Sequence, residues 1–209
     1  MKPDLTLYFI TDSTGITKEQ LCRTVEEACK GGATLVQLRE KNRSGREYLH
    51  LARLVKNVTD RYNVPLIIDD RADVALASGA AGVHVGSEDI PIADIRRFAP
   101  DGFIIGATAK TVEAALKAES DGADYIGTGA IFPTTTKVKT VITEVSVLKE
   151  ICACVNIPVC AIGGLNSDNC GILKDSGISG MAVVSAIMKS SDPKTAAERL
   201  RDKITELLS

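Results

Sequence analysis

The chain has 209 residues, with 25 Lys and Arg against 27 Asp and Glu, which gives a formal net charge of −2 at pH 7. A charge this close to zero gives no sign of a nucleic-acid partner. Apolar residues make up 44% of the chain and charged residues 25%, which excludes a disordered or fibrous protein. Only 4% of the residues are aromatic and none is Trp, so small aliphatic residues must fill the core, which favours an α/β fold.

The first apolar segment, which begins at Leu5, has about seven residues. It is too short for a signal peptide and far below the ~20 residues that span a bilayer. The six cysteines include no C-x-x-C pair, so their spacing predicts neither a disulfide framework nor a zinc site. We therefore expect a cytoplasmic protein with no membrane partner.

Short apolar runs rich in Val, Ile and Leu alternate with longer segments of helical period. Such runs are typical of parallel strands that are buried on both faces. We predict strands at residues 5–11, 34–39, 66–70, 82–86, 103–108, 125–131, 159–164 and 181–185. We predict helices at residues 18–30, 45–62, 111–120, 143–155 and 194–208. Thr17, Ser167 and Asp192 have the residue type and position of helix N-caps.

Several short motifs recur at a nearly constant displacement. The pair at 32–33 (Gly-Ala) returns at 122–123 after 90 residues, and the Asn-Val-Pro-Leu at 63–66 resembles the Asn-Ile-Pro-Val at 156–159 after 93. Two similar halves with four strand–helix units each predict a single (β/α)8 TIM barrel. No G-x-G-x-x-G follows the first strand, which argues against an open doubly wound sheet. At this length, we expect residues 1–209 to form one catalytic domain.

Polar residues gather at the carboxyl ends of the predicted strands, where chemistry takes place in such barrels. Gln37, Arg39 and Lys41 end the second strand, and the alternation of side chains puts them on one face. Two cations and an amide can bind a polyanion, although the same residues would suit a solvated strand end. Asp70 and Asp89 follow neighbouring strands, where two carboxylates can bind Mg²⁺ or remain unrelated acids on adjacent loops.

The last two strands lead into short segments that suit a phosphate. Gly163 and Gly164 follow the seventh strand, and Val184 and Ser185 end the eighth. Barrels often bind phosphate here through backbone amides, although paired glycines also serve plain turns. His84 lies within the fourth strand, and we expect it to point into the barrel and brace the site rather than act as a general base.

These motifs, taken together, resemble those of the thiamine-phosphate synthase family. The matching segments run in order through nearly the whole chain and are 37–41 (Q-L-R-E-K), 69–71 (D-D-R), 82–86 (G-V-H-V-G), 131–137 (I-F-P-T-T-T-K), 162–164 (I-G-G) and 184–187 (V-S-A-I). The resemblance implies a transferase that joins 4-amino-2-methyl-5-hydroxymethylpyrimidine diphosphate to a thiazole phosphate. The products would be thiamine phosphate and diphosphate, formed with Mg²⁺ as cofactor.

The resemblance also implies a role for each matching residue. The residues implied to bind the pyrimidine diphosphate are Gln37, Arg39, Lys41, Asp69, Thr108 and Lys137, of which Arg39, Lys41, Thr108 and Lys137 are the implied catalytic residues. Those implied to bind the thiazole phosphate are Thr134, Thr136, Gly164, Val184 and Ser185, and those implied to bind Mg²⁺ are Asp70 and Asp89. The chain departs from the family pattern at Asp69, where Asn is usual, and at Thr108, where Ser is usual.

The reaction of similar enzymes is dissociative, so the carbon–oxygen bond to diphosphate would break before the thiazole nitrogen attacks. Other enzymes remain open, namely a thiazole tautomerase, an isomerase of the tryptophan-biosynthesis type and a Schiff-base aldolase that uses Lys137. A non-catalytic sensor of a thiazole or thiamine phosphate is a further alternative. Lys41 and the segment 134–137 argue against the tautomerase. The oligomeric state stays open, a homo-oligomer included, as does a carboxyl group on the thiazole.

Overall fold

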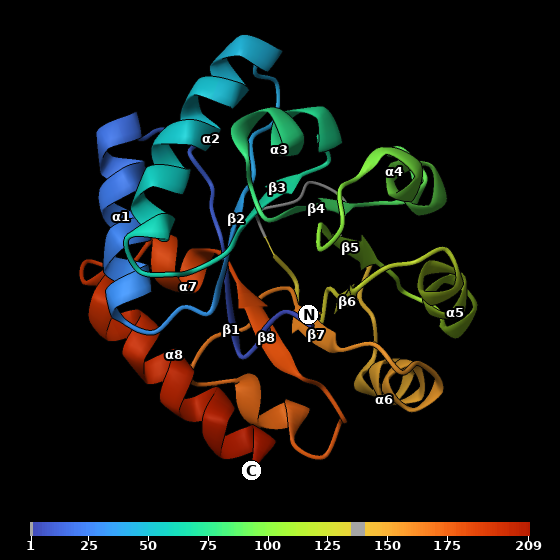
Figure 1. Ribbon diagram of the computed structural model, residues 1–209. Coiled ribbons are helices and arrows are strands. Elements are labelled where there is room, and N and C mark those ends of the chain that lie inside the picture. Colours follow the sequence, from blue (N-terminus) through green and yellow to red (C-terminus); the bar gives the residue numbers. More distant parts are fainter. Residues whose placement is uncertain (1, 135–140) are drawn as a thin grey trace.

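The computed structural model describes residues 2–134 and 141–209 and shows a closed barrel of eight parallel strands (Figure 1). The strands are β1 (Leu7–Ile10), β2 (Leu35–Leu38), β3 (Leu66–Asp69), β4 (Gly82–Val85), β5 (Ile104–Thr108), β6 (Tyr125–Gly129), β7 (Val159–Ile162) and β8 (Gly180–Val183). Neighbours in sequence pair in space, and β8 pairs with β1 to close the barrel. The predicted TIM barrel is therefore confirmed.

The helices lie outside the ring of strands (Figure 1). They are α1 (Lys18–Lys30), α2 (Gly45–Asp60), α3 (Ala72–Ser78), α4 (Ile92–Phe98), α5 (Val112–Ser120), α6 (Val145–Cys154), the 3₁₀ helix η1 (Cys170–Leu173), α7 (Ser185–Met188) and α8 (Pro193–Leu208). Every predicted strand and helix is present, with ends that differ by at most two residues. The short helices α3, α4 and α7 were not predicted, because one or two turns give too little periodicity to recognise.

Side chains before the helices explain where two of them begin. The Thr17 hydroxyl accepts a hydrogen bond from the N–H of Gln20, and the Gln20 side chain accepts one from the N–H of Thr17, which forms a capping box for α1. The Asp192 carboxylate caps α8 by accepting a hydrogen bond from the N–H of Thr195, with Pro193 as the first helical residue. The prediction that Ser167 is a helix N-cap is wrong. Instead, Asn166 Oδ1 accepts hydrogen bonds from the N–H groups of Asp168 and Asn169, which forms a turn before η1.

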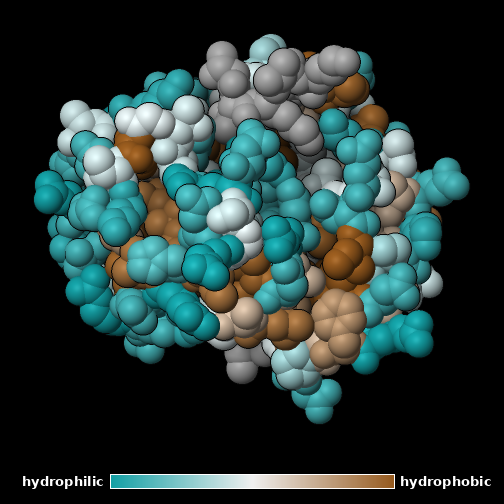
Figure 2. Space-filling view, turned by 90° about the horizontal axis from the view of Figure 1, so that it is seen from above, coloured by the Kyte–Doolittle hydropathy of each residue, from teal (hydrophilic) through white to brown (hydrophobic). Residues whose placement is uncertain are grey.

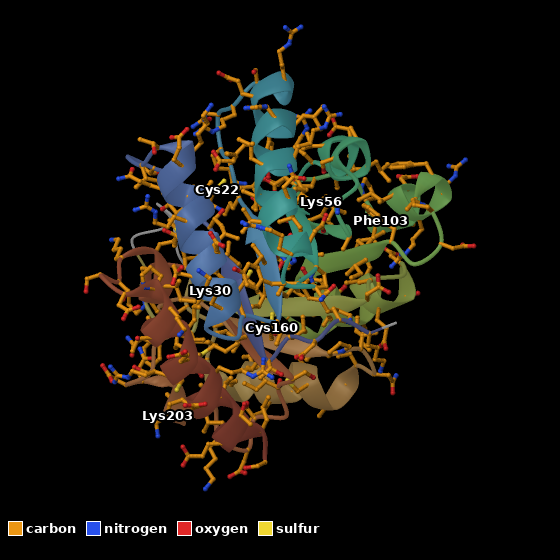
Figure 3. The ribbon with its side chains drawn as sticks, turned by 60° about the vertical axis from the view of Figure 1, so that its left-hand side comes forward. Cys22, Lys30, Lys56, Phe103, Cys160 and Lys203 are labelled. Atoms are coloured by element: carbon orange, nitrogen blue, oxygen red, sulfur yellow. The ribbon has the colours of Figure 1, made fainter. Side chains whose placement is uncertain are left out.

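The interior of the barrel has a core of its own, separate from the larger core between strands and helices. It is formed by Leu5, Tyr8, Ile10, Leu35, Ile67, Tyr125, Cys160 and Ala182. Figure 3 shows Cys160 among the strands, whereas Lys30 and Lys203 lie on the outer helices. Leu5 precedes β1 and is buried in this core, so its side chain fills part of the amino end of the barrel.

Within residues 2–134 and 141–209, no helix has the length and hydropathy needed to cross a bilayer. The face seen in Figure 2 is mainly hydrophilic, with hydrophobic residues in separate patches. All six cysteines are free thiols.

The close packing at the start of β8 predicts a large effect on stability. A Cβ at Gly180 would lie 1.7 Å from the carbonyl oxygen of Leu5. Gly180→Ala must therefore move backbone, and we expect it to lower the free energy of unfolding by about 3 kcal/mol. The control is Gly171→Ala, where a Cβ meets no heavy atom within 4 Å, with an expected change below about 0.5 kcal/mol. Urea denaturation measures both, and equal values would contradict this packing.

Candidate active site

A cavity of about 180 Å³ opens at the carboxyl ends of the strands. Its walls include these residues predicted from the sequence: Gln37, Arg39, Asp69, Thr108, Thr134, Gly164, Val184 and Ser185. They come from or follow six different strands, so closure of the barrel is what brings them together. Two further predicted residues, Thr136 and Lys137, lie outside the described residues.

Basic and acidic side chains from β2 and β3 meet on one side of this cavity. Lys41 Nζ lies 3.0 Å from Asp69 Oδ2 and also contacts the carboxylate of Asp70. Arg39 Nε lies 3.8 Å from Asp69 Oδ2. Burial raises the pKa of Asp69 to about 6, and the charge of Asp70 adds to the rise, while Lys41 and Arg39 oppose it. The carboxyl group is therefore held in a place that disfavours its charge.

The raised pKa of Asp69 predicts a pH-dependent cost to stability. The folded protein binds this proton more tightly than the unfolded chain, where an Asp titrates near ~3.9. The contribution of Asp69 to stability is therefore lost as the pH rises from ~4 to ~6, by about 2 to 3 kcal/mol. In Asp69→Asn, the free energy of unfolding relative to wild type should rise by that amount between pH 4 and pH 7.

Denaturant titrations across this pH range provide the check. Asp73→Asn is the control, because a hydrogen bond from Arg71 lowers the pKa of Asp73 and its removal should give a slope of the opposite sign. A difference between wild type and Asp69→Asn that does not change with pH would contradict the buried carboxyl group.

Asp70 and Asp89 lie beside this cluster and close to each other. Asp89 Oδ2 accepts a hydrogen bond of 2.7 Å from the N–H of Gly86. Burial raises the pKa of Asp89, the bond from Gly86 opposes the rise, and the charge of Asp70 and a hydrogen bond with it increase it further. Asp70 has a φ of 60°, in the left-handed region that few residues other than Gly adopt.

The two carboxylates fit a hard divalent cation. A bound Mg²⁺ would relieve the repulsion between these two carboxylates. Mg²⁺ commonly takes one or two carboxylates together with phosphate oxygens and water as its ligands. The described part of the chain contains no group of three or more His, Cys, Asp and Glu side chains that could hold a metal. Asp70 and Asp89 would therefore supply only part of the oxygen ligands of such an ion.

Small residues form the opposite wall, since β7 lies across the barrel from β3. Gly163 and Gly164 have φ values of 104° and 65°, which favour glycine. A Cβ at Gly164 would lie 2.7 Å from the Cβ of Phe132, so this loop can pack against the end of β6 only with glycine here. Backbone is therefore exposed to the cavity at Gly164, next to Val184 and Ser185.

A chain of hydrogen bonds runs through the barrel interior, and all of its members except Tyr125 line the cavity. Gln37 Nε2 donates to the Tyr8 hydroxyl at 2.6 Å, and the hydroxyls of Tyr8 and Tyr125 are 2.7 Å apart. His84 Nδ1 lies 3.0 Å from the Tyr125 hydroxyl, and His84 Nε2 lies 2.9 Å from Thr108 Oγ1. Burial lowers the pKa of His84 to about 4, although the charge of Asp70 opposes this. A neutral His84 points inward, as the sequence predicts.

Sequence reasoning missed some residues of the site. Lys110 lines the cavity just after β5, and its place two residues beyond Thr108 in the sequence could have indicated it. Tyr8 and Tyr125 had no such signal, because each lies inside an apolar run where a core residue is the ordinary expectation.

Comparisons with known proteins point to one family. The profile of a family described as thiamine monophosphate synthase matches residues 7–187. A thiamine-phosphate synthase of Clostridium tetani is 49% identical over 197 residues, which cover 94% of each protein. Thiamine-phosphate synthase 2 of Streptococcus pneumoniae is 49% identical over 205 residues, which cover 98% of each.

Solved structures give the same result. A thiamine phosphate pyrophosphorylase from Pyrococcus furiosus aligns with a TM-score of 0.90 and 40% identity, over 100% of this chain and 99% of that one. A 3-hexulose-6-phosphate synthase, 16% identical with a TM-score of 0.75, shares the fold alone. The resemblance found in the motifs is confirmed by a family profile and by relatives that span nearly the whole chain, and the chain belongs to the thiamine monophosphate synthase family.

Proposed function

We propose that the protein catalyses the synthesis of thiamine phosphate and diphosphate from 4-amino-2-methyl-5-hydroxymethylpyrimidine diphosphate and a thiazole phosphate. One observation supports this proposal: a single cavity has Arg39 and Asp69 on one wall, with Lys41 in contact with Asp69, and has backbone at Gly164 on the wall across the barrel. Two substrates that each carry phosphate can therefore enter side by side. The one barrel would carry the whole reaction.

The side of the cavity formed by Gln37, Arg39 and Asp69, here called the β2–β3 wall, would bind the pyrimidine diphosphate. Arg39 and Lys41 supply the positive charge that a diphosphate needs, and the resemblance adds Lys137 to them. Asp69 lies beside both cations and lines the cavity, and Gln37 and Thr108 would offer an amide and a hydroxyl to the pyrimidine. Asp70 and Asp89 would hold Mg²⁺, which supplies positive charge to the diphosphate when bound.

The opposite wall would bind the thiazole phosphate. The backbone N–H groups at Gly164, Val184 and Ser185 follow the last two strands, the usual place for a phosphate in this fold. Thr134, which also lines the cavity, and Thr136 would add hydroxyl donors. A carboxylated thiazole phosphate belongs to the same proposal.

The chemistry follows from this placement. The carbon–oxygen bond to the diphosphate breaks and its electron pair leaves with the diphosphate, where Arg39, Lys41 and Lys137 stabilise the growing charge. The amino group of the ring stabilises the pyrimidinylmethyl cation. The thiazole nitrogen, held in line by its bound phosphate, then forms the new carbon–nitrogen bond. With a thiazole phosphate that has no carboxyl group, no proton is lost or gained, so the reaction needs no general base. A carboxylated thiazole phosphate would in addition lose CO₂ and take up one proton at the ring carbon that carried the carboxyl group.

The proposal is tested by incubating the purified protein with both substrates and Mg²⁺ and then leaving out each component in turn. Thiamine phosphate and diphosphate should form in equal amounts, and only in the complete mixture. A tautomerase would convert the thiazole alone, and a sensor would bind its ligand in calorimetry without turnover. Either result would contradict the proposal.

A cytoplasmic location belongs to the proposal as well. Its support is that all six cysteines are free, which is usual for proteins in a reducing compartment. The two small-molecule substrates are the partners that the proposed reaction requires.

A further inference from the structure

The buried hydrogen-bond chain joins two residues that face the cavity. Gln37 and Thr108 line the cavity, and Tyr8, Tyr125 and His84 connect them through the barrel interior. Tyr8 is 1% exposed and Tyr125 is 0% exposed. Buried hydroxyl groups rarely go without partners, so each proton of this chain must be donated to the next member.

The amide of Gln37 sets the direction of the chain. Since Gln37 Nε2 donates to Tyr8, the proton of Tyr8 is left to be donated to Tyr125. Tyr125 then donates to His84 Nδ1, which must be unprotonated. A doubly protonated ring would leave the Tyr125 proton without an acceptor. The proton of the neutral ring is therefore on Nε2 and is donated to Thr108 Oγ1.

The packing keeps the rings of this chain in place. A Cβ at Gly106 would lie 2.0 Å from Cζ of Tyr125, and a Cβ at Gly127 would lie 3.3 Å from Cε1 of His84. The absence of a side chain at Gly106 and Gly127 therefore leaves space for the rings of Tyr125 and His84. The rings of Tyr8 and Tyr125 meet edge to face, with centroids 5.7 Å apart.

We propose that Tyr8 and Tyr125 are positioning residues that fix the donor and acceptor pattern of the cavity, with the carbonyl Oε1 of Gln37 as acceptor and the hydroxyl of Thr108 as donor. The pattern selects a pyrimidine whose exocyclic amino group donates to Gln37 and rejects the ring with an oxo group there. This specificity deepens the proposed function and rests on it for the identity of the ring.

The test measures binding rather than turnover. The probes are 4-amino-2-methyl-5-hydroxymethylpyrimidine monophosphate and its 4-oxo counterpart, which have no diphosphate to release. In calorimetry, wild type should bind the amino form at least about 10-fold more tightly, because the oxo form leaves Gln37 Oε1 facing another acceptor. Tyr125→Phe takes away the acceptor of the Tyr8 proton. The side-chain amide of Gln37 can then flip, so that its carbonyl oxygen accepts from Tyr8 and its NH₂ group faces the cavity. The preference should then fall at least fivefold.

Two further variants sharpen the comparison. Tyr8→Phe also frees the Gln37 amide and should lower the preference, and it serves if Tyr125→Phe does not fold. The matched control is Tyr62→Phe, since the hydroxyl of Tyr62 donates to Glu26 outside the barrel, 2.9 Å away. This variant should keep the wild-type preference. An unchanged preference in both barrel variants would overturn the proposal.

Nitrogen NMR reports which ring nitrogen of His84 carries the proton, and it needs no ligand. The protein has 2 His, and His50→Gln assigns the signals of His84. We expect a neutral His84 with its proton on Nε2 in wild type and loss of that single form in Tyr125→Phe. A wild-type His84 ring with its proton on Nδ1 would mean that the hydrogen bonds run in the opposite direction, and it would overturn the proposal. If these results hold but no thiamine phosphate forms, the proposed function fails and the hydrogen-bond chain stands.

Discussion

Replacement of Arg39 by alanine is expected to lower the rate of diphosphate release by about 100-fold or more. The guanidinium lines the cavity beside Asp69, and its side chain is 21% exposed. A cation in such a partly shielded place stabilises the charge that develops on the leaving diphosphate by a few kcal/mol, and each ~1.4 kcal/mol corresponds to tenfold in rate. We expect the same loss for Lys137→Ala, which the resemblance places on the diphosphate.

The control for this measurement is Arg97→Ala. Arg97 lies on α4 with its side chain 81% exposed, so its removal should leave turnover within about twofold of wild type. Steady-state release of diphosphate under saturating thiazole phosphate gives the comparison. A loss of less than threefold for Arg39→Ala would contradict its role at the leaving group.

Replacement of Asp89 by asparagine is expected to raise the Mg²⁺ concentration needed for half-maximal turnover by about 10- to 100-fold. An amide keeps the size of the carboxyl group but not its charge, and it leaves Asp70 as the one proposed ligand with a full negative charge. Added Mg²⁺ should restore part of the activity. The loss should therefore be larger at low Mg²⁺ than at high Mg²⁺.

Turnover measured against Mg²⁺ concentration gives this result directly. Asp94→Asn is the matched control, because Asp94 lies on α4 with its side chain 56% exposed and should leave the curve unchanged. Identical curves for wild type and Asp89→Asn would remove Asp89 from the proposed metal site.

The fold could be predicted because its strands are buried on both faces. Segments such as 66–69 and 159–162 are short, apolar and separated by helical segments, and this pattern is typical of a parallel sheet. The recurrence of motifs after about 90 residues then favoured closure into a barrel. The expectation at Ser167 failed because the same residue types cap helices and shape turns, and only the structure shows which backbone groups they meet.

The site could be predicted in part, for a related reason. Gln37, Arg39 and Asp69 follow from the barrel rule that strand ends carry the chemistry, since each ends an apolar run. The hydrogen-bond chain could not be predicted, because it depends on the positions of Tyr8 and Tyr125 across the barrel. These residues are 117 apart in sequence, and no local pattern records that their hydroxyls meet.

The most direct measurement is the structure of the protein with diphosphate, thiamine phosphate and Mn²⁺ in place of Mg²⁺. The metal should lie on Asp70 and Asp89, with diphosphate between it and Arg39. The phosphate of thiamine phosphate should lie across the cavity on the backbone of Gly164 and Ser185. Diphosphate or metal bound away from the β2–β3 wall would contradict the proposal that one cavity holds both substrates side by side.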